Sequence, residues 1–193
     1  FEINAANALL KRLEEPPAGT IFLLVAHSPG RLLPTIRSRC RVLRFGKLDD
    51  AAMTSALRAR LPDADPLELN ALVAAGEGAP GKALRFAGLD IASIDAALAD
   101  LAGSGDRNNA LRLRLAQQLS GKAAQARYEV FLQRVPAYIA GVSRARSGDA
   151  LGLALAQWEK ARSLAAHAVA GSLDPQNVVF ALAGHVAALA PAG

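Results

Sequence analysis

The chain has 193 residues, of which 52% are hydrophobic and 20% are charged, and this balance predicts a packed core rather than a disordered segment. No apolar run reaches the roughly 18–20 residues that span a bilayer, and the first residues predict no secretion signal. The single cysteine allows no internal disulfide and no cysteine-based zinc site. We therefore expect a cytoplasmic protein that has no membrane partner and binds no metal.

The net charge of +5 is unevenly distributed along the chain. Residues 1–46 carry seven Lys/Arg and three Asp/Glu, residues 47–103 carry five and nine, and residues 104–193 carry ten and five. The net charges are therefore +4, −4 and +5, and we expect a domain boundary at each change of sign. The basic segments leave two interpretations open, a surface for nucleic acid or helices whose arginine-rich faces are simply solvated.

Residues 1–46 predict a helix, a strand, a short helix or pair of turns, and a last strand. Pro16 and Pro17 must end the first helix, and Asn4 is a suitable cap for its start. A short apolar run beside turn residues is typical of a buried strand in a parallel sheet, and alternating apolar and basic residues predict a strand with one wet face. The four elements are expected at residues 4–15, 20–26, 31–37 and 41–45.

The rest of the sequence predicts only helices, so the fold class is mainly α. Shorter helices are expected at residues 49–61, 66–76, 79–87 and 91–101, with Pro66 suited to the first helical position. Residues 103–106 form the clearest linker. Four longer helical stretches are expected after it at residues 108–119, 123–146, 149–170 and 175–189, and Pro136 should kink or split the second of them.

Three segments carry a family resemblance. They are NAANALLKRLEEPP at residues 4–17, FLLVAHSPGRLLPTIRSRC at residues 22–40 and GAPGKAL at residues 78–84. Together they resemble bacterial clamp-loader subunits of DNA polymerase III, which are AAA+ proteins, and most closely the delta-prime subunits that do not hydrolyse ATP. The resemblance implies the C-terminal part of an AAA+ α/β domain at residues 1–46, a helical lid at residues 47–103 and a helical collar at residues 104–193.

The resemblance also implies roles for single residues. Arg39 would be an arginine finger, offered in trans to ATP bound by a neighbouring subunit, with Ser38 fixing it by a local hydrogen bond and Cys40 as a small buried side chain. His27 occupies the sensor-1 position. Spacing alone favours an ordinary surface arginine at position 39, and His27 is equally well interpreted as a strand-end histidine without a special role. No G-x-x-x-x-G-K-S/T phosphate loop occurs, so we expect no cofactor in this chain.

A basic run accompanies these motifs, because no acid lies between the five arginines at positions 31, 37, 39, 41 and 44. Such an edge suits DNA phosphate or an acidic partner surface, and the position of Arg39 favours the partner. Two apolar stripes on later helices are candidates for anchoring a neighbouring collar, although core packing is the simpler interpretation of each. The stripes are Leu151, Leu155 and Trp158, and Val178, Leu182, His185 and Leu189.

By resemblance, the chain contributes to ATP-driven loading of the sliding clamp on primed DNA, beside gamma/tau and delta subunits. It would hold no self-contained catalytic site, although it would belong to the DNA polymerase III holoenzyme, a DNA-directed DNA polymerase. One alternative is a gamma/tau-type ATPase, but the sensor-2 arginine of such proteins falls on Gly81, one place from Lys82. The other alternative is a basic helical DNA-binding module. Because Phe1 leads directly into a helix, we expect the C-terminal portion of a longer protein.

Overall fold

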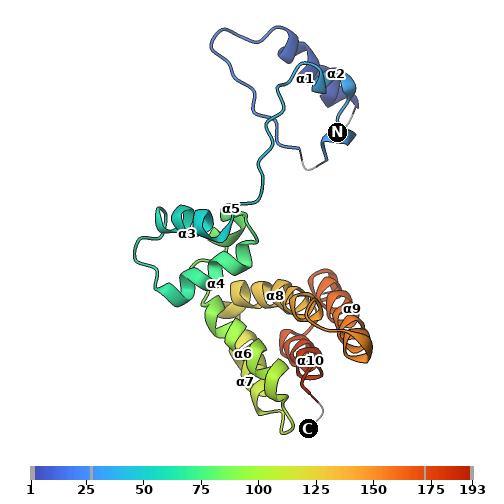
Figure 1. Ribbon diagram of the computed structural model, residues 1–193. Helices are drawn as coiled ribbons and strands as arrows, with labels where there is room; N and C mark the ends of the chain where they lie inside the picture. Colours follow the sequence, from blue (N-terminus) through green and yellow to red (C-terminus); the bar gives the residue numbers. More distant parts are fainter. Residues whose placement is uncertain (1–2, 27, 172, 192–193) are drawn as a thin grey trace. The chain divides into compact units, whose positions relative to one another are not determined.

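The computed structural model describes residues 3–26, 28–171 and 173–191 and consists of helices and connecting loops (Figure 1). It divides into two compact units, Phe1–Gly46 and Lys47–Gly193. The mainly helical class predicted from the sequence is confirmed.

Within its described residues, the first unit contains three helical elements. Helix α1 covers Ile3–Glu14, a 3₁₀ turn η1 covers Pro29–Arg31, and helix α2 covers Pro34–Arg37. Helix α1 ends just before Pro16 and Pro17, because a proline ring clashes with the preceding turn and offers no N–H. Pro34 stands at the first position of α2, where the missing N–H costs nothing.

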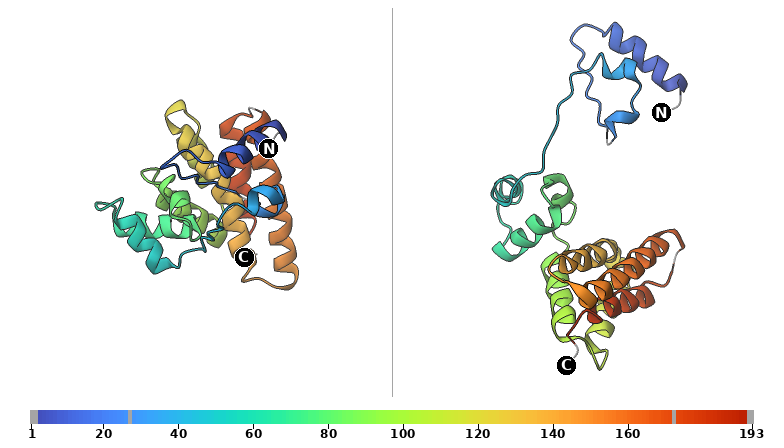
Figure 2. Two further views of the ribbon diagram at one scale, coloured as in Figure 1. Left: turned by 90° about the horizontal axis from the view of Figure 1, so that it is seen from above. Right: turned by 45° about the vertical axis from the view of Figure 1, so that its right-hand side comes forward.

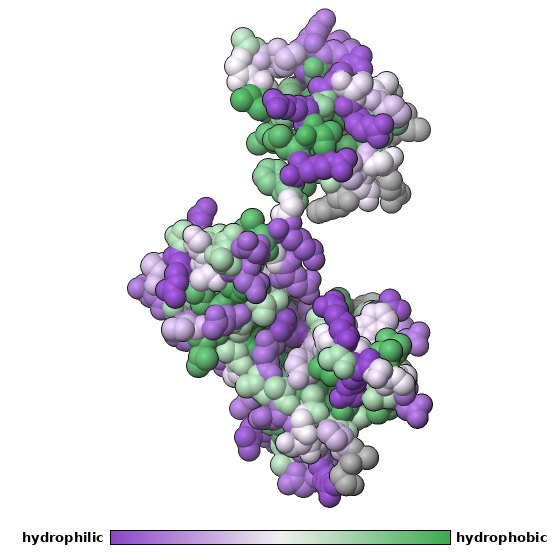
Figure 3. Space-filling view, in the orientation of Figure 1, coloured by the Kyte–Doolittle hydropathy of each residue, from purple (hydrophilic) through white to green (hydrophobic). Residues whose placement is uncertain are grey.

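The prediction of strands at residues 20–26 and 41–45 is wrong. Both segments are irregular backbone, and the described part of the chain contains no strand. A strand exists only if its N–H and C=O groups pair with a neighbouring strand, and no such neighbour is present in the described residues. The apolar side chains therefore stay in solvent, with Val25 88% and Phe45 93% exposed. Figure 3 shows the resulting apolar surface on the visible face of this unit.

The second unit is built from eight α-helices and a 3₁₀ turn within its described residues. They are α3 (Asp50–Arg58), α4 (Pro66–Gly76), α5 (Pro80–Leu84), α6 (Ile91–Ser104), α7 (Ala110–Leu119), η2 (Lys122–Ala124), α8 (Gln125–Ser143), α9 (Gly148–Gly171) and α10 (Pro175–Ala187). Aspartates begin three of the helices: the side chains of Asp49, Asp65 and Asp174 accept hydrogen bonds from free N–H groups of the first turn. Pro66 lies at the first position of α4, as predicted.

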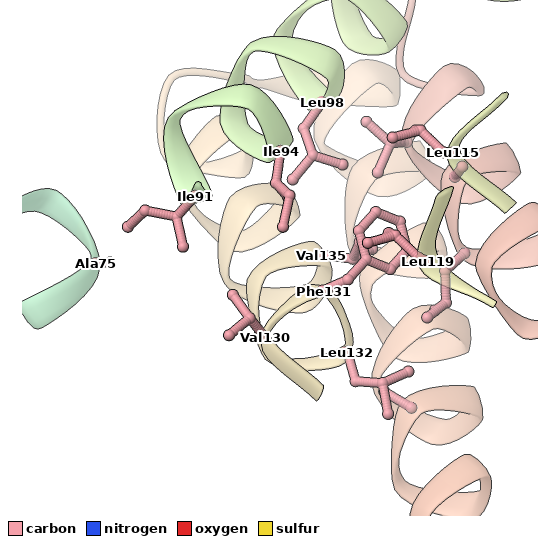
Figure 4. Close-up of a cluster of buried hydrophobic side chains, with 14 of the residues drawn as sticks. Ala75, Ile91, Ile94, Leu98, Leu115, Leu119, Val130, Phe131, Leu132 and Val135 are labelled. Carbon is pink, nitrogen blue, oxygen red and sulfur yellow. The ribbon is translucent and has the colours of Figure 1, made fainter. Parts of the chain in front are cut away.

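One apolar core runs through this unit, and α6 contacts α4, α8 and α10 within it. Ile94 and Leu98 of α6 share a buried cluster with Phe131 and Val135 of α8 (Figure 4). An ion pair closes the edge of this contact, because Arg134 Nε lies 2.9 Å from Asp95 Oδ1. Helix α6, which was predicted as part of the lid, thus packs directly against helices that were predicted as the collar. The division into a lid and a collar stays a prediction.

Helices α8, α9 and α10 lie side by side (Figures 1 and 2). The buried face of α9 consists of small residues, which let neighbouring helices approach closely. They are Ala154, Ala161, Ala165 and Ala168. Pro136 does not split α8, which is one continuous helix in the structure.

The prediction of a linker at residues 103–106 is also wrong. Gly103 and Ser104 form the last turn of α6, and Gly105 ends the helix with a φ of +70°. The carboxylate of Asp106 is buried and accepts hydrogen bonds from the N–H groups of Leu111 and Arg112. Glycine and serine suit a helix end as well as a linker, so composition alone does not distinguish the two.

Candidate functional site

The corner between α1 and α2 positions Arg39. Ile36 is 2% exposed and anchors α2 in the first unit, while Arg39 follows two residues after the helix ends. The N–H of Ser38 donates to the carbonyl of Pro34 at 2.9 Å, and the N–H of Arg39 donates to the carbonyl of Ile36 at 3.2 Å. These turns fix the backbone from which the arginine side chain projects.

Two further contacts orient the guanidinium of Arg39. Its Nη2 lies 2.5 Å from Oε1 of Glu14, at the end of α1. Its Nη1 donates to the carbonyl of Thr35 at 3.0 Å. A guanidinium has five N–H donors, so these contacts leave donors available for an anion. The contacts with Glu14 and Thr35 hold the side chain in place, and because it is 39% exposed it can still be reached from solvent.

Ser38 and Cys40 flank the arginine in different ways. The hydroxyl of Ser38 donates to the carbonyl of Thr35 at 3.1 Å, which is the kind of local hydrogen bond expected for it. Cys40 is half-buried and its thiol is free, so it is less enclosed than the small buried side chain expected there. Arg39 and Cys40 line a groove of about 600 Å³ whose walls include Phe22 and Phe45.

The structure does not gather all of the predicted residues around Arg39. His27 lies outside the described residues, as does the side chain of Arg31. Arg37, Arg41 and Arg44 are exposed on the same unit as Arg39. The expected basic surface therefore has four described arginines, and one of them, Arg39, is paired with a carboxylate.

Glu14 is a residue of the candidate site that the sequence motifs do not identify, because it lies outside the Ser38-Arg39-Cys40 motif. A signal was available in the composition. The arginine run contains no acid, and residues 1–46 contain only Glu2, Glu14 and Glu15. An ion pair for Arg39 inside this segment therefore had to come from one of three carboxylates.

In the second unit, Lys82 is held by Glu77. The Nζ of Lys82 lies 3.0 Å from Oε2 of Glu77, and the hydrogen bond from Lys82 lowers the pKa of this carboxyl. Gly81, where the resemblance places the sensor-2 position, is exposed. Lys82 thus has a local structural partner, and Arg85, which directly follows the end of α5, is exposed.

No cluster of three or more His, Cys, Asp or Glu side chains that could hold a metal occurs among the described residues. His185 has an amide partner, because its Nδ1 lies 2.8 Å from Oε1 of Gln157, and burial lowers its pKa. His167 contacts the carbonyl of Ser163 through Nδ1 at 2.7 Å. No helix in the described part of the chain has the length and apolar character needed to cross a membrane.

Comparison with known proteins finds relatives of part of the chain. The family described as "DNA polymerase III, delta subunit" matches residues 1–49. The DNA polymerase III subunit delta' of Pseudomonas aeruginosa is 49% identical over 89 residues, which are 46% of this chain and 27% of that protein. Its counterpart in Yersinia pestis is 43% identical over 98 residues, 49% of this chain and 29% of that protein. The chain thus spans less than a third of the length of these relatives.

A subunit with another name also matches. The DNA polymerase III subunit tau of Salmonella typhimurium is 36% identical over 119 residues, which are 57% of this chain and 18% of that protein. No solved structure is significantly similar to the chain.

These matches first indicate a class: residues 1–49 match a DNA polymerase III subunit family, and parts of the chain are similar in sequence to DNA polymerase III subunits. Within this class, the similarity to delta-prime subunits predicted from the sequence motifs is confirmed for the part of the chain that aligns. The aligned segments include the corner that carries Arg39 and Glu14.

Proposed function

We propose that this chain is the C-terminal portion of a clamp-loader subunit of the delta-prime type. In this role it hydrolyses no ATP itself and presents Arg39 to ATP bound by an adjoining gamma/tau-type subunit. The partners are gamma/tau and delta subunits in the cytoplasm, and the sliding clamp and primed DNA are reached through the assembled complex.

The observation that carries this proposal is the state of Arg39. An arginine finger needs a permanent charge, a fixed orientation and access to the γ-phosphate of the next subunit. Arg39 has the first by its chemistry, Glu14 and Thr35 support the second, and a side chain that is 39% exposed is compatible with the third. The delta-prime relatives supply the context in which such an arginine is expected.

The helical second unit would contribute collar contacts within the ring. Val178, Leu182 and Leu189, candidates for these contacts by sequence, are buried in the core of this unit. They are therefore unavailable to a partner, and the expectation that this stripe anchors a neighbouring collar is wrong. The contacts would therefore have to come from other surfaces of α7 to α10.

The tau relative makes a gamma/tau-type ATPase the second candidate. The exposed Gly81 counts against it, because a glycine at the sensor-2 position has no guanidinium to reach a nucleotide. The same subunit, purified from a clone of its complete gene, should hydrolyse no ATP alone if the delta-prime role is correct. Hydrolysis by the isolated subunit would favour the gamma/tau role.

Reconstitution tests the proposal itself. A clamp loader assembled from gamma/tau, delta and the complete subunit should load clamps on primed DNA, while omission of the subunit should abolish loading. Co-purification with gamma/tau that survived deletion of residues 104–193 would contradict the collar role. Tight duplex binding by the subunit alone, falling steeply with salt, would instead indicate the DNA-binding module.

A further inference from the structure

Helix α9 has a second apolar face in addition to the buried alanine face. Leu151, Leu155 and Trp158 share this face, where they line a groove of about 500 Å³ between the end of α8 and the start of α9. Leu155 is 49% exposed, whereas its neighbour Ala154 is fully buried. Trp158 is partly buried and packs against the core, so the groove lies at the edge of the core, and its exposed apolar side chains cost free energy while they stay in water.

The rim of the groove is basic. Arg144, which is exposed, and Arg146, which is half-buried, line the groove, and the guanidinium of Arg162 lies 5.0 Å from the centre of the Trp158 ring. Residues 144–162 contain four basic side chains and two acidic ones, Asp149 and Glu159, a net charge of +2. An occupant that carries carboxylates beside its apolar side chains would complement both the floor and the rim.

The floor suits a protein segment better than a small polar ligand. Its one buried polar side chain, Ser143, already donates its hydroxyl to the carbonyl of Ile139 at 2.7 Å. The Nη2 of Arg146 likewise donates to the carbonyl of Leu189 at 2.6 Å. Pockets for small molecules depend on polar groups placed to fix orientation, and the hydroxyl in this floor is already used.

We propose that the groove formed by Leu151, Leu155 and Trp158 docks an acidic amphipathic helix of a partner protein. The apolar side of that helix would cover Leu155 and the indole, while its carboxylates would face Arg144 and Arg162. This inference does not rest on the clamp-loader role, because it uses only residues of the second unit.

Trp158 provides the readout, since it is the single tryptophan of the 193-residue chain. The probe is a synthetic amphipathic peptide of about twelve residues, or three helical turns, with leucines on one face and glutamates on the other. The comparison peptide carries lysine in place of each glutamate. The acidic peptide should produce a saturable change in Trp158 fluorescence, and the lysine peptide should bind about tenfold more weakly or not at all.

Two leucines of α9 give a matched pair of variants. Leu155→Ser should weaken binding of the acidic peptide about tenfold, the expected result of losing one buried leucine contact. Leu153→Ser is the control, because Leu153 is 43% exposed but does not line the groove. It should change the affinity less than about twofold. Circular dichroism of each variant checks that α9 is intact.

The charges are tested separately. Arg144→Gln should weaken binding about threefold, as expected for one exposed charge pair, and should reduce its salt dependence. Arg114→Gln on α7 should have no effect. Equal binding of the two peptides, equal effects of the two leucine variants, or no saturable signal would each overturn the proposal. A fluorescence change that followed the concentration of the chain alone would also overturn it, since the groove would then join two copies.

Discussion

Arg39 and Glu14 form an ion pair across the corner between α1 and α2, with Nη2 and Oε1 2.5 Å apart. Both side chains are well exposed, at 39% and 50%, so the pair contributes little to stability. Its effect is geometric. Glu14 limits the directions in which the guanidinium can point, and Thr35 limits them further. A fixed orientation reduces the entropy that is lost when the arginine meets a phosphate.

The first prediction concerns Glu14. Glu14→Gln in the complete subunit should lower clamp loading by the reconstituted complex severalfold, because the arginine loses its charged partner. The free energy of unfolding should change by less than about 1 kcal/mol. Glu15→Gln is the control, since Glu15 is an exposed neighbour. In an Arg39→Ala background, Glu14→Gln should have no additional effect. An additive loss would indicate that Glu14 acts independently of Arg39.

The second prediction concerns Asp106, whose carboxylate is 4% exposed and caps the start of α7. Burial raises its pKa, but the hydrogen bonds from Leu111 and Arg112 together outweigh burial and lower the pKa. Asp106→Asn should therefore cost about 2 kcal/mol at pH 7, measured by urea unfolding with Trp158 fluorescence.

The sign of the pH dependence follows from the lowered pKa of Asp106. A carboxyl whose pKa is depressed by folding stabilises the protein above its unfolded pKa, and this stability is lost as the pH falls through the folded pKa. The difference between wild type and Asp106→Asn should therefore shrink as the pH falls below 3.8, the ordinary value. A difference that stayed constant down to about pH 2 would contradict the assigned role.

The third prediction concerns the close approach of α4 and α5 at Gly76. A methyl group there would lie 2.9 Å from Cβ of Ala83 and 2.5 Å from Cε of Met53. The methionine can move aside, but the alanine cannot. Gly76→Ala should therefore destabilise the second unit by about 1–3 kcal/mol. Gly152→Ala on α9 is the control, because a methyl group there meets nothing within 4 Å, and it should stabilise by about 0.5–1 kcal/mol. Thermal unfolding of both variants would measure the contrast.

The helical part of the fold was largely predictable from the sequence. Pro66 is a local signal for a helix start, and α4 runs from Pro66 to Gly76, the range predicted for it. The strand signals of residues 20–26 were equally local, but strand formation depends on a partner elsewhere, and the described residues provide none. The same reason explains the stripe of Val178 and Leu182, because periodicity shows that residues share a face and not what covers that face.

The candidate site was predictable only in part. The Ser38-Arg39-Cys40 motif identifies the arginine because its residues are adjacent in the sequence. Glu14 lies 25 positions earlier, and only the packing of α1 against α2 brings it to the guanidinium. The groove at Trp158 likewise depends on how α8 meets α9, which the helical pattern of either segment does not specify.

The most direct test of the proposed role is clamp loading with Arg39→Ala. The variant should fold and assemble as the wild type does, because an exposed arginine contributes little to stability. A complex that depends wholly on one finger loses about 10³–10⁵-fold in rate, but here other sites keep turning over, so ATP hydrolysis should fall far less and clamp loading should fall most. Arg39→Lys should restore little, because an ammonium lacks the planar pair of donors. Wild-type rates of both DNA-stimulated hydrolysis and clamp loading in Arg39→Ala would contradict the assignment of Arg39 as the finger.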